Sequence, residues 1–355
     1  MERILIKCGR VFDGNAFACK DIFTENGIIS KIEPNITDTA EFVFDAKGMI
    51  VSPGLVDTHV HIKGLSSDDF GINAEMSCLP FGVTAALDAG SSHGDRAFLD
   101  SLVVKNIVFV AQGLEEEELD FKNTEKLLEK YGDKAIGLKA YFDTEISAVR
   151  DIKPLEQVCA YARKKGIKVM VHCSNSPVPM ADIVKTLSCG DILTHIYHGG
   201  ENNCTESDFE AFKNAKERGV IMDAGFAGHV HTDFAVLRRA IAEGFLPDTI
   251  STDITKLSAY KRGGRYGMTM CMSMMRSLGV AEEEIFKRVT LNPAVALGKK
   301  DEWGALCVGR AADIAVFDYI DEGFDLTDKA GNNFKSQYGY RCVLTVLNGQ
   351  ILYKD

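Results

Sequence analysis

Residues 51–64 read VSPGLVDTHVHIKG. This apolar run, broken by a Pro-Gly turn, ends in two histidines, His59 and His61, that are separated by one residue. Alternate residues of a strand face the same side, so both imidazoles are expected to point together from the end of a buried strand. A single histidine is more often an ordinary core or surface group. Two on one face favour a metal site, because neutral imidazole is a common zinc ligand.

Between residues 51 and 304, short apolar runs alternate with amphipathic stretches. The runs predict strands over residues 54–57, 83–88, 108–111, 136–139, 169–172, 192–195, 220–223 and 249–253. Helices are expected over residues 155–165, 180–187, 206–218, 234–243 and 268–275. Continuous apolar runs are typical of strands buried on both faces of a parallel sheet. Eight such units in about 250 residues predict an α/β fold, the (β/α)8 TIM barrel.

Both ends of the chain have a different pattern, made of short β-like runs and turns. They lie at residues 4–8, 17–23 and 28–32, and at residues 312–317, 341–347 and 351–353. The Asn348-Gly349 pair between the last two runs is a strong hairpin signal. We therefore expect residues 1–50 and 305–355 to build one small β-sandwich domain beside a barrel of residues 51–304.

The composition limits the kinds of partner that the protein is expected to bind. A net charge of −11 without a basic cluster argues against binding nucleic acid. No apolar run reaches the roughly 18 residues of a membrane helix, and the first residues lack a signal-peptide pattern. Ten scattered cysteines without CxxC spacing indicate free thiols in a reducing cytoplasm. A small-molecule substrate is expected, and self-association into a homo-oligomer is left open.

Four more candidate ligands fall at predicted strand ends, namely Lys139, His172, His195 and Asp253. The carboxyl ends of barrel strands form the face where barrel active sites lie. Lys139 is the difficult member, since an ammonium is costly to bury and cannot bind a cation. Either its ammonium group extends to the edge of the barrel, or the lysine is covalently modified.

PGLVDTHVH, residues 53–61, resembles the PGxxDxHxH signature of the amidohydrolase superfamily. The later strand-end residues are similar to its metal-site pattern, as are TLNPAVALG (290–298) and GALCVGRAADIAVFD (304–318). The resemblance covers almost the whole chain. ALDAGSSHG, HCSNSPVP and GDILTHIYHG are similar to the amidohydrolase/deacetylase subgroup, with its D-aminoacylase-like and dihydroorotase-like proteins.

This resemblance implies two divalent metal ions, with zinc as the expected metal, and a carbamate formed from CO₂ on Lys139. One metal would take His59, His61, Lys139 and Asp253, and the other Lys139, His172 and His195. A hydroxide bridging the metals would attack the substrate, with Asp253 as general base and then general acid. Asp57 would support a histidine tautomer.

Five further residues are candidate substrate contacts: Tyr141, His198, His229, His231 and Arg265. Tyr141 stands two residues after the lysine, where relatives often carry an arginine, so the substrate preference is expected to differ. His229 and His231 form a second HxH pair, but it follows a Gly-rich loop and not a strand. A role in a substrate loop is therefore favoured over a rival metal pair.

The leading function is hydrolysis of an amide, or of an ester, in a small N-acyl or O-acyl compound. This is a hydrolase of carbon–nitrogen bonds other than peptide bonds. The alternatives are a cyclic amide hydrolase of the dihydroorotase or hydantoinase type, and a catalytically silent binding barrel. A single-zinc deaminase is less favoured because of Lys139, and the complete ligand set argues against a silent barrel.

Overall fold

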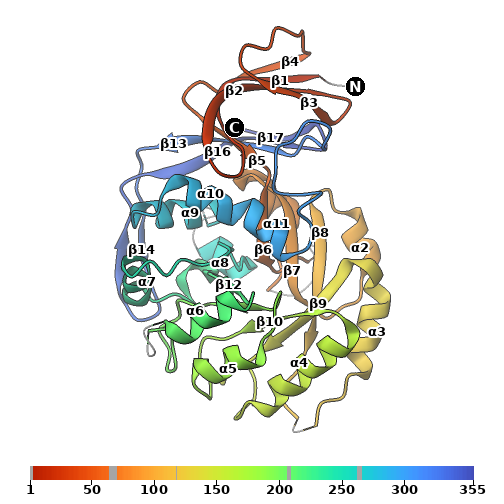
Figure 1. Ribbon diagram of the computed structural model, residues 1–355, viewed down its shortest axis with the longest axis vertical. Helices are drawn as coiled ribbons and strands as arrows, with labels where there is room; N and C mark the ends of the chain where they lie inside the picture. The colour runs from red at the N-terminus through yellow and green to blue at the C-terminus, as the bar shows by residue number, and fades with distance from the viewer. Residues whose placement is uncertain (1–2, 64–69, 117, 206–208, 262–265) are drawn as a thin grey trace.

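The computed structural model describes residues 3–63, 70–116, 118–205, 209–261 and 266–355. Two large sheets dominate it, a parallel sheet of seven strands and a second sheet of eight strands (Figure 1). None of the helices in these residues combines the length and apolarity needed to cross a bilayer.

The parallel sheet has the order β12-β11-β10-β9-β8-β7-β6. Its strands are β6 (Leu55–Val60), β7 (Val83–Ser91), β8 (Lys105–Gln112), β9 (Ala135–Tyr141), β10 (Lys168–His172), β11 (Ile192–Thr194) and β12 (Ile221–Asp223). Every residue of β6 is buried. Gly54 is required just before this strand, because a Cβ there would lie 2.1 Å from Thr84 Oγ1.

Seven of the eight strands expected from the sequence are present, and the eighth is not a regular strand. Residues 249–254 make only single parallel bridges, Asp223 to Thr249 on one side and Val60 to Ile254 on the other. These bridges nearly close the sheet into a barrel. The segment cannot continue as a strand because Asp253 has a left-handed backbone, with φ of 47°.

Helices pack around this sheet (Figure 1). They are α1 (Ala74–Cys78), α2 (Arg96–Ser101), α3 (Lys122–Tyr131), α4 (Lys153–Lys165), α5 (Met180–Thr186), α6 (Glu210–Glu217), α7 (Phe234–Ala242), α8 (Lys256–Lys261), α9 (Met268–Ser277), α10 (Glu282–Val289) and α11 (Leu291–Ala296). Short 3-10 turns lie at η1 (Leu79–Phe81), η2 (Gly132–Lys134) and η3 (Ala227–His229). The expected helix at 206–218 begins within residues that lie outside the described ones. The methionines of α9 are mostly buried, as expected of a core helix.

Both ends of the chain contribute to the eight-stranded sheet, whose order is β17-β16-β13-β5-β1-β2-β3, with β4 paired to β1. Its strands are β1 (Ile4–Phe12), β2 (Phe17–Glu25), β3 (Ile28–Glu33), β4 (Phe42–Asp45), β5 (Ile50–Pro53), β13 (Ile314–Ile320), β16 (Gly339–Leu347) and β17 (Gln350–Lys354). Hydrogen bonds join them into one continuous sheet, and its β1–β3 and β13–β16 parts share one hydrophobic core, as the two layers of the expected sandwich would. Asn348 and Gly349 both have positive φ, as a tight hairpin between β16 and β17 requires.

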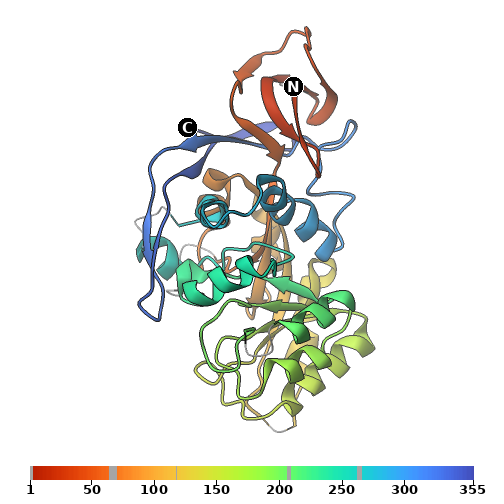
Figure 2. The same cartoon turned by 60° about the vertical axis from the view of Figure 1, so that its left-hand side comes forward.

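A third, two-stranded sheet joins the C-terminal segment to the barrel. It is the hairpin of β14 (Asp325–Thr327) and β15 (Asn333–Lys335), which lies beside α7 in both views (Figures 1 and 2). Asp328 accepts the Phe234 N–H at 2.7 Å, and Phe334 packs on Phe234 with ring centroids 5.2 Å apart. The hairpin turn thereby reaches the loops at the mouth of the barrel.

Candidate metal centre

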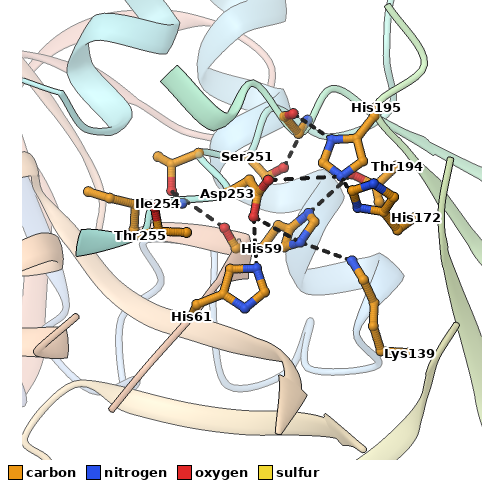
Figure 3. A network of polar contacts seen from close by, with 12 residues as sticks. His59, His61, Lys139, His172, Thr194, His195, Ser251, Asp253, Ile254 and Thr255 are labelled. Carbon is orange, nitrogen blue, oxygen red and sulfur yellow. Dashed lines mark hydrogen bonds and ion pairs between the residues drawn. The ribbon is translucent and has the colours of Figure 1, made fainter. Parts of the chain in front are cut away.

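The barrel strands deliver the candidate ligands to one end of the sheet. His172 is the last residue of β10, and His59 and Lys139 lie one and two residues before the ends of β6 and β9. His195 and Asp253 have left-handed backbones, with φ of 66° and 47°. Such strained conformations cluster at functional sites. Together with His61, these residues converge on one point (Figure 3).

His59, His61 and Asp253 form a first group, whose ligand atoms all lie within 4.8 Å of one another. Asp253 Oδ1 lies 2.8 Å from His61 Nε2 and 3.2 Å from His59 Nε2. The other oxygen, Oδ2, is 3.9 Å from His195 Nε2, so this carboxylate links the first group to the second. Burial alone would raise the pKa of Asp253, but the neighbouring His59 and His61 outweigh it and hold the pKa below its usual range.

His172, His195 and His231 form a second group of the same size. His195 Nε2 lies 2.9 Å from His172 Nδ1. The His231 ring lies against both partners, with centroids 4.3 Å from His195 and 4.8 Å from His172. The sequence predicted the first two as ligands and His231 as a substrate contact.

Thr194 and Asp223 determine the tautomer of His59, and the sequence pattern did not predict a role for either. Thr194 Oγ1 donates its only hydrogen to Asp223 Oδ2 at 2.8 Å. The same oxygen lies 3.1 Å from His59 Nδ1, so it must accept a hydrogen from that nitrogen. His59 Nε2 is therefore left with a lone pair facing the site. Asp223 also accepts hydrogen bonds from Thr58, Thr249 and Ser251, which fixes its carboxylate.

Hydrogen bonds also determine which nitrogens of the second group carry a hydrogen. His195 Nδ1 donates to the Gly225 carbonyl at 2.7 Å, and His172 Nε2 faces Asp143 Oδ2 at 3.3 Å. The two nitrogens that face each other at 2.9 Å consequently both lack a hydrogen. Burial lowers the pKa of His172 to about 4 and that of His195 well below its ordinary value, so neither is protonated at neutral pH. Facing lone pairs repel unless a cation lies between them, so these residues fit a metal ion.

Lys139 is fully buried, and its Nζ lies 2.9 Å from His59 Nε2 and 3.3 Å from Met170 Sδ. No ion pair joins it to a carboxylate within the described part of the chain. Burial lowers the pKa of Lys139 to about 8, so part of the amine is neutral near physiological pH. A neutral amine is the form that can add CO₂, and the resulting carboxylate would supply the missing negative charge.

Two carboxylates support the site in ways that differ from expectation. Asp57 does not contact a histidine ring. It accepts the backbone N–H groups of His59 and Thr252, each at 3.1 Å, and so joins β6 to the closing segment. Asp143, and not Asp57, supports a histidine ring. It accepts hydrogen bonds from His172 and from Ser174. Asp223 ends a predicted strand, which was a usable signal, whereas Asp143 had none.

The remaining predicted contacts are spread around the site. Tyr141 lies beside it, with its ring centroid 5.8 Å from that of His172. His229 is turned away and packs on Phe234 and Tyr266. Arg265 lies outside the described residues.

A cavity of about 230 Å³ lies next to the second group, and His231 and His198 line it. His198 Nδ1 accepts the Gly200 N–H, and Nε2 is buried without a hydrogen-bond partner among the described residues. Lys329, from the hairpin turn, forms part of the wall and pairs with Glu145 at 2.8 Å. This cavity is therefore a polar space beside the candidate metal centre.

Comparison with known proteins agrees with this architecture and site. The family model of the amidohydrolase family matches residues 50–352. A deacetylase of Agrobacterium fabrum is 30% identical over 310 residues, which cover 81% of this chain and 75% of that protein. A deacetylase of Enterococcus faecalis is 27% identical, with 98% of each chain covered. A dihydroorotase crystal structure has the same fold, with a TM-score of 0.88, 24% identity and coverage of 100% of this chain and 98% of the other.

The chain belongs to the amidohydrolase family. It is accordingly a hydrolase of carbon–nitrogen bonds, and the resemblance found in the sequence is confirmed.

Proposed function

We propose that this protein is a binuclear zinc hydrolase that removes an acyl group, with acetyl as the first choice, from a small N-acyl or O-acyl compound. The observation that carries the proposal is the pair of ligand groups, in which hydrogen-free histidine nitrogens converge and Asp253 lies between them. The deacetylases of Agrobacterium fabrum and Enterococcus faecalis support the choice of substrate class.

The residues divide into two sets. His59, His61 and Asp253 would hold one metal, and His172 and His195 the other. Lys139, carbamylated by CO₂, would be shared by both. When bound, such metals polarise a carbonyl and lower the pKa of water at the site to near neutrality. Imidazole and carboxylate donors are suited to zinc.

A side chain of the protein would transfer the proton from the attacking water to the leaving group. Asp253 has one oxygen against His61 and the other near His195, so it lies between the two ligand groups. We assign it the removal of a proton from the attacking water and its delivery to the leaving nitrogen. The depressed pKa of Asp253 keeps its carboxylate ionised at neutral pH, which is the protonation state that a general base requires.

The adjoining cavity is proposed to hold the leaving group of a small-molecule substrate. Its volume of about 230 Å³ suits a compound of amino-acid size. The buried His198 Nε2 and the ammonium of Lys329 would contact the polar part of this group.

Three further assignments belong to this proposal. Residues 249–254 act as the eighth strand of a (β/α)8 barrel, supported by their bridges to both neighbours. The barrel domain takes residues 51–304, and the β domain takes residues 1–50 and 305–355. All ten cysteines are free thiols, which favours a cytoplasmic location.

The test is hydrolysis by zinc-loaded protein prepared with bicarbonate. The panel contains N-acetyl amino acids of both hands, O-acetyl hydroxy acids, dihydroorotate and hydantoins. Turnover of an acyclic acetyl compound is expected. Turnover of ring compounds alone would replace the deacetylase with a cyclic amide hydrolase. Two bound zinc ions without turnover of any compound would overturn both substrate classes.

A further inference from the structure

The second HxH pair is divided by the fold. His229 and His231 are two residues apart, yet His229 packs into the core between Phe234 and Tyr266, whereas His231 reaches the candidate metal centre. The loop achieves this with a left-handed backbone at Gly228 and at His229. Only one member of the pair is therefore available to the site.

His231 completes a set of three imidazoles. Its ligand nitrogen and those of His172 and His195 all lie within 4.8 Å of one another, a separation that one ion can span. Its ring contacts both of the others, at 4.3 Å and 4.8 Å between centroids. Imidazole is a common metal ligand in proteins, and the position of this ring gives it access to an ion held by the other two.

The surroundings favour a cation at this point over a hydrogen bond among the rings. The hydrogens of His172 and His195 are directed outward, to Asp143 and to the Gly225 carbonyl, so neither ring donates inward. The set of ligand atoms that all lie within 4.8 Å of one another here consists of three imidazoles and contains no carboxylate. Three neutral nitrogen donors around one point form a typical zinc environment.

We propose that His231 is a direct ligand of the metal held by His172 and His195. This inference rests on the proposed function, because it presupposes the two-metal site. Besides the Lys139 carbamate that both metals would share, their donors would then differ, with two imidazoles and the Asp253 carboxylate at one site and three imidazoles at the other. Imidazole donors favour zinc and cobalt over manganese, so His231 would also make the second site more selective.

The test measures metal binding in the absence of substrate. Wild type and His231→Ala are stripped of metal, treated with bicarbonate and titrated with zinc against a chelator. They are then loaded with cobalt for visible absorption spectra. Loss of an outer partner of a metal ligand already costs about 10–100-fold in affinity, so loss of the ligand itself is expected to weaken one of two sites by at least about tenfold.

Two controls make the result specific. His93→Ala removes an exposed imidazole outside both ligand groups and should leave both affinities and the cobalt spectrum unchanged. His231→Asn retains a polar side chain, and its circular dichroism and thermal unfolding show whether the loop still folds. A weaker second site and an altered cobalt spectrum in both His231 variants would support the proposal.

The contrary outcomes are distinct. Unchanged metal affinities and spectra with a raised KM in His231→Ala would make this residue a substrate contact and overturn the inference alone. Failure of every substrate in the hydrolysis panel would leave the metal titration valid and overturn only the proposed reaction. A wild-type chain that binds fewer than two metals would overturn both.

Discussion

Replacing Thr194 with valine removes one hydroxyl that connects His59, a proposed metal ligand, to the buried carboxylate of Asp223. Thr194 is fully buried, and valine has nearly the same shape, so the packing is preserved. The change eliminates the hydrogen bond from His59 Nδ1 and the one to Asp223. No hydrogen bond then holds the hydrogen on Nδ1, because Asp223 Oδ2 is 3.9 Å away. The hydrogen can move to Nε2, where Asp253 Oδ1 lies 3.2 Å away and can accept it.

The expected loss of stability follows from the two hydrogen bonds that Thr194 makes. A neutral hydrogen bond contributes about 0.5–1.5 kcal/mol and one to a charged group about 1.5–3 kcal/mol. We therefore expect the free energy of unfolding of the metal-free protein to fall by about 2–4.5 kcal/mol. Loss of the partner that orients His59 should weaken metal binding about 10–100-fold.

Thr194→Ser is the matched control, because it keeps the hydroxyl and loses only a buried methyl group, which contributes about 1 kcal/mol. Urea unfolding gives the stability, and zinc titration against a chelator gives the affinity. The reasoning is refuted if the valine variant binds zinc as tightly as the serine variant, since His59 would then not need Thr194 to present its lone pair.

Two other predictions concern groups inside the site. Asp253→Asn should abolish turnover while both metals stay bound, and substantial residual hydrolysis would remove Asp253 from proton transfer. Burial lowers the pKa of Lys139 to about 8, so between there and about 10.5 the unfolded chain carries a proton that the folded chain has released. Stability of the metal-free, bicarbonate-free protein should therefore rise with pH across this window, by up to about 3 kcal/mol relative to Lys139→Met, and fall as pH drops through about 8. Parallel curves for the two proteins would show that Lys139 is not perturbed.

Much of the fold was predictable because strand ends carry their own signals. His59 and His172 follow continuous apolar runs, and those runs became β6 and β10. Periodicity could not show that residues 249–254 would lack a regular strand. The left-handed backbone of Asp253 is imposed by contacts with β6, including a hydrogen bond from its N–H to the His59 carbonyl.

The candidate site could be predicted only where the proposed ligands lie at or near the ends of predicted strands. The partners that orient those ligands are distant in sequence, and a pattern of spacing contains no trace of them. His59 depends on Thr194, which is 135 positions away, and Lys329 meets Glu145 across 184 positions. The HxH motif gives no reason to distinguish His229 from His231, whereas the fold separates them.

The shared sheet of the two chain ends has a consequence for synthesis. Strand β5 lies between β1 and β13, and Arg10 bonds Tyr319 across 309 positions. At about 5–20 residues per second, a ribosome needs roughly 15–60 s to reach Tyr319 after it has added Arg10. During that time β5 has an open edge that other chains could pair with. The turn carrying Lys329 is translated after Tyr319, so this part of the cavity wall also forms late. Rapid closure of the barrel, or binding of a chaperone, would shorten the time for which this edge of the nascent chain is exposed.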